Sequence, residues 1–246
     1  MILPFRCAAE DIQAAGLSCT EEEPCPLFLE LSAAASPSAG HIVAAGNIHT
    51  ESATLYSILL ASENAGQSWS EVYERTRGAG LDHIQFADSD NGWVSGQDLF
   101  PIPQNPFLLL TNDGGKSWVK RPVLSESADL RFGSVQQFFF TDKTAGLLIV
   151  DRGQGSDTDR YALYESQNGG QSWDIRQESA KPLRLKQTAP ASDWRIQVDA
   201  ASHSFHIEHR QGGNWSSAAA FSVKLDPCKP PPPPAPAPEV GADGKP

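Results

Sequence analysis

Three closely similar octets recur along this chain of 246 residues: SENAGQSW, TNDGGKSW and SQNGGQSW. They occupy residues 62–69, 111–118 and 166–173, so the tryptophans that close them are 49 and 55 residues apart. Spacings of about 40–50 residues with several strands per unit are typical of propeller blades. Because such a unit cannot bury its apolar face alone, the repeats constrain the fold more than any other feature of the sequence.

The stretches between the octets are short β-branched or aromatic runs separated by Gly, Asn, Asp and Ser clusters, as in HIQFADSDNGWVSG and VQQFFFTDKTAGLLIV. Many short strands with regular turn signals predict an all-β fold. We therefore predict a small β-propeller of about four four-stranded blades, with a β-sandwich as the second choice. A fifth blade would require strands within the first 25 or so residues. The predicted units are 28–76, 77–124, 131–180 and 183–226; in the last, Trp215 after a Gly-Gly pair replaces the full octet.

Each octet has the pattern [S/T]-x-[D/N]-x-G-x-S-W, which predicts a hairpin turn between two strands. The Asp or Asn oxygen can accept hydrogen bonds from backbone N–H groups one or two residues further on, and the glycine supplies a left-handed backbone. The tryptophan then begins the outer strand and packs on the blade. The pattern residues are Ser62, Asn64, Gly66, Ser68, Trp69, Thr111, Asp113, Gly115, Ser117, Trp118, Ser166, Asn168, Gly170, Ser172 and Trp173.

These octets resemble Asp-boxes, also called BNR repeats, which occur in sialidases, sortilin-type receptors and many bacterial propellers. The longer pattern over residues 28–226 is similar to the propellers of photosystem II stability/assembly factors and their bacterial relatives. This resemblance implies that the octet is structural and lies at the blade periphery. It also implies a scaffolding or assembly role toward another protein, although those relatives have more blades.

The four cysteines are placed at the two ends of the predicted domain: Cys7, Cys19 and Cys25 near the start, and Cys228 at the end. Full pairing allows three connectivities, and each of them bonds Cys228 to one of the other three. Free thiols and a metal site are the alternatives, although no C-x-x-C pair is present. Disulfides indicate an oxidising compartment, so we expect a periplasmic, extracellular or lumenal protein. The first residues, MILPFRCAAED, do not form a signal peptide, so the leader would be missing from this sequence.

Composition excludes several classes of partner. The formal charge of −11, with scattered Lys and Arg, argues against nucleic acid and anionic membrane surfaces. No apolar run approaches the ~20 residues of a membrane helix. The domain is predicted to end at residue 228, because the Pro-rich stretch 229–246 favours an extended, disordered tail.

A search for catalytic motifs finds no G-x-S-x-G elbow, Walker loop or H-E-x-x-H helix. The acidic stretch 88–92 begins like a calcium loop but lacks the later glutamate. We therefore expect no catalytic residues, no cofactor and no metal, and a non-enzymatic scaffold that binds a protein. A carbohydrate-binding or glycosidase-like propeller is the alternative, and the oligomeric state stays open. The candidate partner contacts are the apolar loop residues Phe100, Pro101, Ile102 and Pro103.

Overall fold

The computed structural model describes residues 5, 7–100, 102–124, 132–153, 159–186, 193–199, 201–202 and 204–230. Over these residues the chain is all-β apart from one short helix, and its strands form four separate antiparallel sheets. Each sheet is a meander in which consecutive strands pair with one another. The prediction of an all-β propeller with four blades is therefore confirmed. The predicted tail 229–246 lies outside the described residues from position 231 onward.

The first two blades have four strands each. Blade 1 consists of β1 (Phe28–Ser38), β2 (His41–His49), β3 (Thr54–Ser62) and β4 (Ser70–Tyr73). Blade 2 consists of β5 (Ala79–Phe86), β6 (Gly92–Asp98), β7 (Gln104–Thr111) and β8 (Val119–Pro122). In both blades the second and third strands are almost wholly buried, which is why they read as continuous apolar runs in the sequence.

Blade 3 repeats this plan, and blade 4 departs from it. Blade 3 consists of β9 (Ser134–Phe140), β10 (Gly146–Asp151), β11 (Tyr161–Ser166) and β12 (Asp174–Ser179). Blade 4 has three strands in the described residues: β13 (Trp194–Asp199), β14 (Ser204–Gln211) and β15 (Asn214–Ser222). The Gly-Gly pair before Trp215 forms the tight hairpin between β14 and β15. It therefore does not join a third strand to an outer fourth strand, and the proposed equivalence with the octets was wrong.

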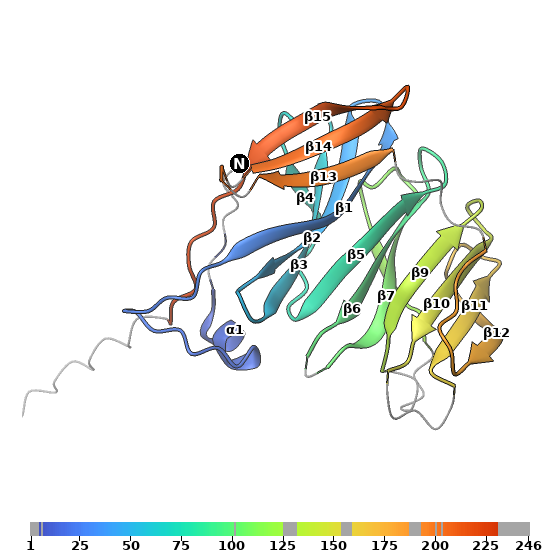
Figure 1. The fold of residues 1–246 in the computed structure, drawn as a ribbon, viewed down its shortest axis with the longest axis horizontal. Coiled ribbons are helices and arrows are strands. Elements are labelled where there is room, and N and C mark those ends of the chain that lie inside the picture. The colour runs from blue at the N-terminus through green and yellow to red at the C-terminus, as the bar shows by residue number, and fades with distance from the viewer. Residues whose placement is uncertain are drawn as a thin grey trace, which may run out of the picture.

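Blades 1, 2 and 3 follow one another in space in chain order, whereas blade 4 lies next to blade 1. Blade 4 packs beside β1 of blade 1, β5 of blade 2 packs against the other side of blade 1, and β9 of blade 3 packs against blade 2. Figure 1 shows the resulting fan of sheets, with β9–β12 at one end and β13–β15 at the other. The last blade thus meets the first. The alternative of a fifth blade is not supported, because residues 7–27 contain a helix and an isolated bridge but no strand.

Two carboxamide side chains, the buried Asn47 and the half-buried Gln85, join neighbouring blades. The side chain of Asn47 on β2 accepts a hydrogen bond from the backbone N–H of Leu81 (2.8 Å) and donates one to its carbonyl (3.1 Å). Gln85 on β5 makes the same pair of bonds to the backbone of Phe140 on β9, at 3.0 and 2.8 Å. Each amide satisfies two backbone groups that the ladders leave free, and so keeps adjacent blades in register.

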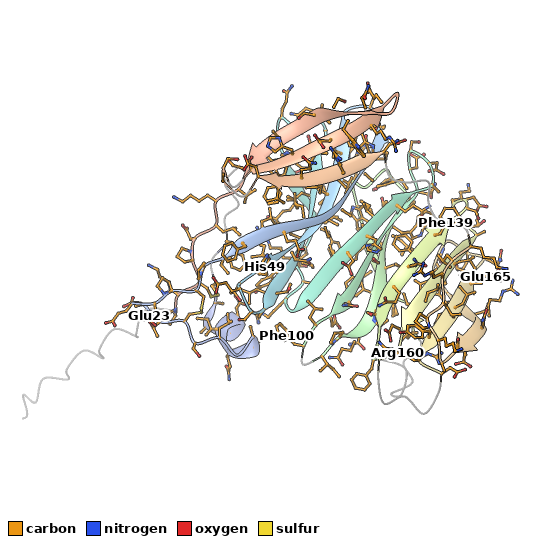
Figure 2. The ribbon with its side chains drawn as sticks, viewed as in Figure 1. Glu23, His49, Phe100, Phe139, Arg160 and Glu165 are labelled. Atoms are coloured by element: carbon orange, nitrogen blue, oxygen red, sulfur yellow. A yellow bond between two sulfur atoms is a disulfide. The ribbon has the colours of Figure 1, made fainter. Side chains whose placement is uncertain are left out.

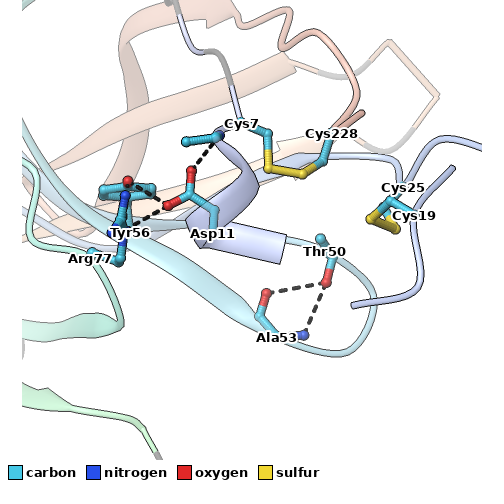
Figure 3. Close-up of a disulfide and its surroundings, with 10 residues drawn as sticks. Cys7, Asp11, Cys19, Cys25, Thr50, Ala53, Tyr56, Arg77 and Cys228 are labelled. Atoms are coloured by element: carbon cyan, nitrogen blue, oxygen red, sulfur yellow. Dashed lines mark hydrogen bonds and ion pairs between the residues drawn. A yellow bond between two sulfur atoms is a disulfide. The ribbon is translucent and has the colours of Figure 1, made fainter. Parts of the chain in front are cut away.

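The N-terminal segment is fastened to blade 1 by helix α1 (Ala9–Ala14) and its buried Asp11. The Asp11 carboxylate accepts from the backbone N–H of Ala8 (2.8 Å) and the hydroxyl of Tyr56 (2.7 Å), and it pairs with the guanidinium of Arg77 (2.7 Å). Figure 3 shows this cluster beside the disulfides. Three partners compensate the charge, which is the condition under which a carboxylate can be buried.

All four cysteines are paired, and they gather at one place. Cys7 bonds to Cys228 across 221 residues, and Cys19 bonds to Cys25 across six. Cys25 also exchanges two backbone hydrogen bonds with Cys228, at 3.1 and 2.8 Å. The long disulfide ties the two ends of the domain together (Figure 3), as full oxidation requires, and it selects one of the three connectivities that spacing leaves open.

Candidate functional site

The three octets form one repeated hydrogen-bond network. The leading hydroxyl donates to the Asn or Asp oxygen two residues on and accepts from the glycine N–H four residues on; in the first octet these distances are 3.0 and 2.7 Å. The same oxygen accepts from the backbone N–H of the serine before the tryptophan, at 2.8 Å for Ser68, 3.0 Å for Ser117 and 3.0 Å for Ser172. The side-chain oxygen of the Asn or Asp thus accepts from backbone N–H groups three or four residues further along the chain. The sequence predicted acceptance from groups one or two residues on.

The middle octet differs from the others in charge. Asn64 and Asn168 donate their amide N–H to the following serine hydroxyl, whereas Asp113 accepts from the hydroxyl of Ser117 at 2.5 Å. Burial raises the pKa of Asp113, but the bonds from Ser117, Thr111 and Lys116 outweigh it and lower that pKa to about 2. Asp113 is therefore an ionised turn residue at neutral pH rather than a proton donor.

The octets also lie at the seams between blades. Their glycines have φ near +90°, and a Cβ placed there would lie against the preceding blade in space: 2.0 Å from the Cβ of Ala219 for Gly66, and 3.0 Å from Val43 for Gly115. Gly170 faces Leu108 of blade 2 in the same way, at 3.6 Å. Glycine is thus required for two reasons: the backbone has a positive φ, and the neighbouring blade leaves little room for a Cβ.

The tryptophans pack beside these glycines. The indole N–H groups of Trp69 and Trp118 donate to the carbonyl of their own octet glycine, at 3.1 and 2.9 Å. The Trp69 ring lies 4.8 Å from the Phe221 ring of blade 4, whereas Trp118 meets Phe86 of its own blade. The buried indole N–H of Trp173 has no hydrogen-bond partner among the described residues. These bonds and contacts tie the octet turns into their blades and into the seams between blades.

The loop between β6 and β7 contains the residues predicted to contact a partner. It lies at the end of blade 2 opposite its octet turn, and this end is here called the loop end. Its base is braced, because Leu99 donates to the carbonyl of Gly78 (2.7 Å) and the Gln104 amide donates to the carbonyl of Phe100 (2.6 Å). Phe100 covers Gly78, where a Cβ would lie 2.8 Å from its ring. Ile102 is 51% exposed and Pro103 is exposed; Pro101 lies outside the described residues.

A hollow of about 450 Å³ adjoins this loop. Phe100 and Gln104 line it together with Arg77 from the blade 1–blade 2 connection and Lys120 from β8. Both cations are already engaged: Arg77 pairs with Asp11, and Lys120 lies 3.4 Å from Asp98 and 3.9 Å above the Phe107 ring. Figure 2 shows Phe100 at this end of the molecule, near α1. Sequence reasoning missed Arg77, Gln104 and Lys120, because no local pattern links residues that meet only after the blades pack.

The described carboxyl groups whose pKa is clearly shifted share one direction of shift. Every described carboxyl group with a clear pKa shift lies below its usual value; these are Asp88, Asp113, Asp142, Asp151, Glu165 and Asp199. The N–H of Asn91 is the largest cause at Asp88, so the calcium-like stretch 88–92 is a turn closed by its own carboxylate. Among the residues that the structure describes, no group of three or more potential metal ligands converges. None of the helices in that part of the chain is long and apolar enough to cross a bilayer.

Comparison with proteins of known structure finds similar β-propellers. The structure of YCF48 bound to a D1 peptide is 15% identical, with a TM-score of 0.42, over 81% of this chain and 57% of that one. A GH74 xyloglucanase from Xanthomonas campestris is 19% identical (TM-score 0.44; 59% of this chain, 21% of that one), and an α-L-arabinanase from Penicillium chrysogenum is 13% identical (0.36; 81% and 62%). The chain thus spans less than two thirds of the length of these relatives. No protein-family model and no curated protein matches the sequence.

Proposed function

We propose that this protein is a non-enzymatic binding propeller of an oxidising compartment, and that it holds a protein partner at its loop end. The observation that carries the proposal is the braced loop of residues 99–100 and 102–105. Hydrogen bonds from Leu99 and Gln104 fix its base, while Ile102 projects into solvent at its tip. A preorganised loop with an apolar tip loses little entropy on binding, and so converts buried apolar area efficiently into affinity.

Three further features support this proposal. A glycosidase needs a carboxylic acid whose pKa is raised so that it can donate a proton. Among the described residues, each carboxyl group with a shifted pKa has it lowered, by hydrogen bonds in turns or by an ion pair. The two disulfides are consistent with a protein exported from the cytosol. The described loop-end hollow combines aromatic, amide and cationic groups, which suits a peptide surface better than an isolated reactive centre.

The test is affinity capture from the exported fraction of the source organism, quantified by mass spectrometry, with wild type, Ile102→Asp and Val198→Asp as baits. Val198 is the matched control, because it is 62% exposed but lies on β13 of blade 4. We expect one partner to be enriched on wild type and Val198→Asp and lost on Ile102→Asp, with equal melting temperatures for all three. Equal capture by all baits, or reproducible binding or turnover in a glycan array and glycosidase screen, overturns the proposal.

A further inference from the structure

A second hollow lies at the opposite end from the loop, in the seam between blades 2 and 3. This seam groove has a volume of about 310 Å³ and runs between the outer strand β8 and the octet turn of blade 3. Trp93 on β6 forms its floor; the ring is almost fully buried, and its indole N–H donates to the carbonyl of Gly169 at 2.8 Å. That bond joins the two walls, so the groove is a fixed feature of the packed blades.

The charge of the groove is opposite to that of the protein. Its charged lining residues are Arg121 and Lys143, and no described carboxylate lines it, in a chain of net charge −11. Neither cation takes part in an ion pair within the described residues, and the recorded side-chain bond of Arg121 is to the carbonyl of Lys120 at 3.3 Å. Asp88 and Asp142 lie in the field of Lys143, but their carboxylates accept hydrogen bonds within their own turns.

Neutral donors complete the lining. The exposed side chains of Asn112 and Gln171 border the groove from the two octet turns and have no recorded hydrogen bond. A carboxamide N–H and a guanidinium both bind carboxylate oxygen well, and charge assistance makes the second contact the stronger. The ligand chemistry that these groups favour is therefore a carboxylate.

One blade earlier, other residues stand at the positions of these two cations, and the hollow beside β4 is lined by Glu71, Glu74, Arg75 and Lys116. By strand register, Tyr73 of β4 takes the place of Arg121, since each pairs with the equivalent leucine of the third strand. Ser89 takes the place of Lys143 in the turn between the first two strands of the blade. The second seam thus differs from the first in that its charged lining residues, among those described, are cations alone.

The outer edge of strand β8 indicates that the ligand is an extended chain. Among the described strands, β8 pairs with β7 alone, so none of those strands occupies its other edge, and Val119 of β8 lines the groove and is 48% exposed. An extended peptide can pair with such an edge, with alternate side chains directed to one face. A sugar would need an exposed aromatic face for stacking, and the one aromatic residue among the described lining residues, Trp93, is 2% exposed.

We infer that the seam groove binds an extended acidic peptide segment, with Arg121 and Lys143 holding two of its carboxylates. This site is separate from the loop end and does not depend on the function proposed for it. Contacts of this exposed kind are weak and salt-sensitive, so we expect affinity that falls as ionic strength rises.

The experiment is calorimetric titration of the full chain with a capped octapeptide of alternating Glu and Thr, and with its Gln counterpart. We expect saturable binding of the Glu peptide, about fivefold weaker in Arg121→Gln or Lys143→Gln and weaker still in the double variant. The control Lys181→Gln removes an exposed cation elsewhere and should bind as wild type does, as should Ile102→Asp. Absent binding, equal binding of the Gln peptide, or indifference to the two groove substitutions overturns the inference. Binding of a heparin octasaccharide in preference to the Glu peptide also overturns it.

Discussion

The contact between the first octet and blade 4 can be tested by adding one methyl group. Gly66→Ala places a Cβ 2.0 Å from the Cβ of Ala219, at a backbone with φ of +87°. Gly213→Ala is the matched control, because Gly213 has φ of +89° but nothing within 4 Å of its added Cβ. The control variant should lose only the left-handed backbone cost, about 1–2 kcal/mol in the free energy of unfolding. Gly66→Ala should lose that amount and about 1–3 kcal/mol more, from overpacking at the seam.

A second substitution distinguishes the two contributions. In the double variant Gly66→Ala/Ala219→Gly the clashing methyl group is removed, so the overpacking cost should be recovered while the backbone cost remains. Ala219→Gly alone costs about 0.5–1 kcal/mol within a strand and supplies the fourth corner of the cycle. The free energy of unfolding is measured by urea denaturation, followed by tryptophan fluorescence and circular dichroism. The reasoning fails if Gly66→Ala and Gly213→Ala are equally destabilised and Ala219→Gly gives no recovery.

Two further predictions concern the disulfides and Asp113. Closing 221 residues should stabilise more than closing six, so Cys7→Ser/Cys228→Ser should lose about 3 kcal/mol more unfolding free energy than Cys19→Ser/Cys25→Ser; equal losses in urea melts contradict this. The pKa of Asp113 is depressed to about 2, so its contribution to stability is present above about pH 4 and is lost as pH falls through 2. Asp113→Asn should flatten that acid slope in pH-dependent melting; an unchanged slope refutes the assignment.

The octets could be predicted in detail because their bonds are local. Each network joins residues at most four positions apart. The side chain that accepts the hydrogen bonds and the glycine that allows the turn therefore both lie within the octet itself. The one local error, the reach of the Asp113 carboxylate, arose from treating the turn as tighter than it is. The prediction that Trp215 closes a degenerate octet in blade 4 was wrong for a related reason. Two glycines precede a tryptophan there as in an octet, but a two-residue hairpin between adjacent strands also requires glycines.

Features built from distant residues could not be predicted. Arg121 and Lys143 belong to different blades, and only the packing of blade 3 on blade 2 makes them line one groove. The same holds for Asp11, Tyr56 and Arg77, which meet when the N-terminal helix docks on blade 1. Asn47 and Gln85 read as ordinary strand residues, and nothing near them in the sequence indicates that each pairs with the backbone of the next blade.

The sequence by itself determined the class of fold and indicated about four blades with a fifth left open, because strand periodicity and turn chemistry act over a few residues and recur along the chain. It also limited the disulfide pairing to three choices. Only the tertiary structure decided that Cys7 is the partner of Cys228, that blade 4 lies beside blade 1, and that Gly66 rests on Ala219. These are contacts between segments up to 221 residues apart, and they depend on how whole sheets pack, which local preferences do not specify.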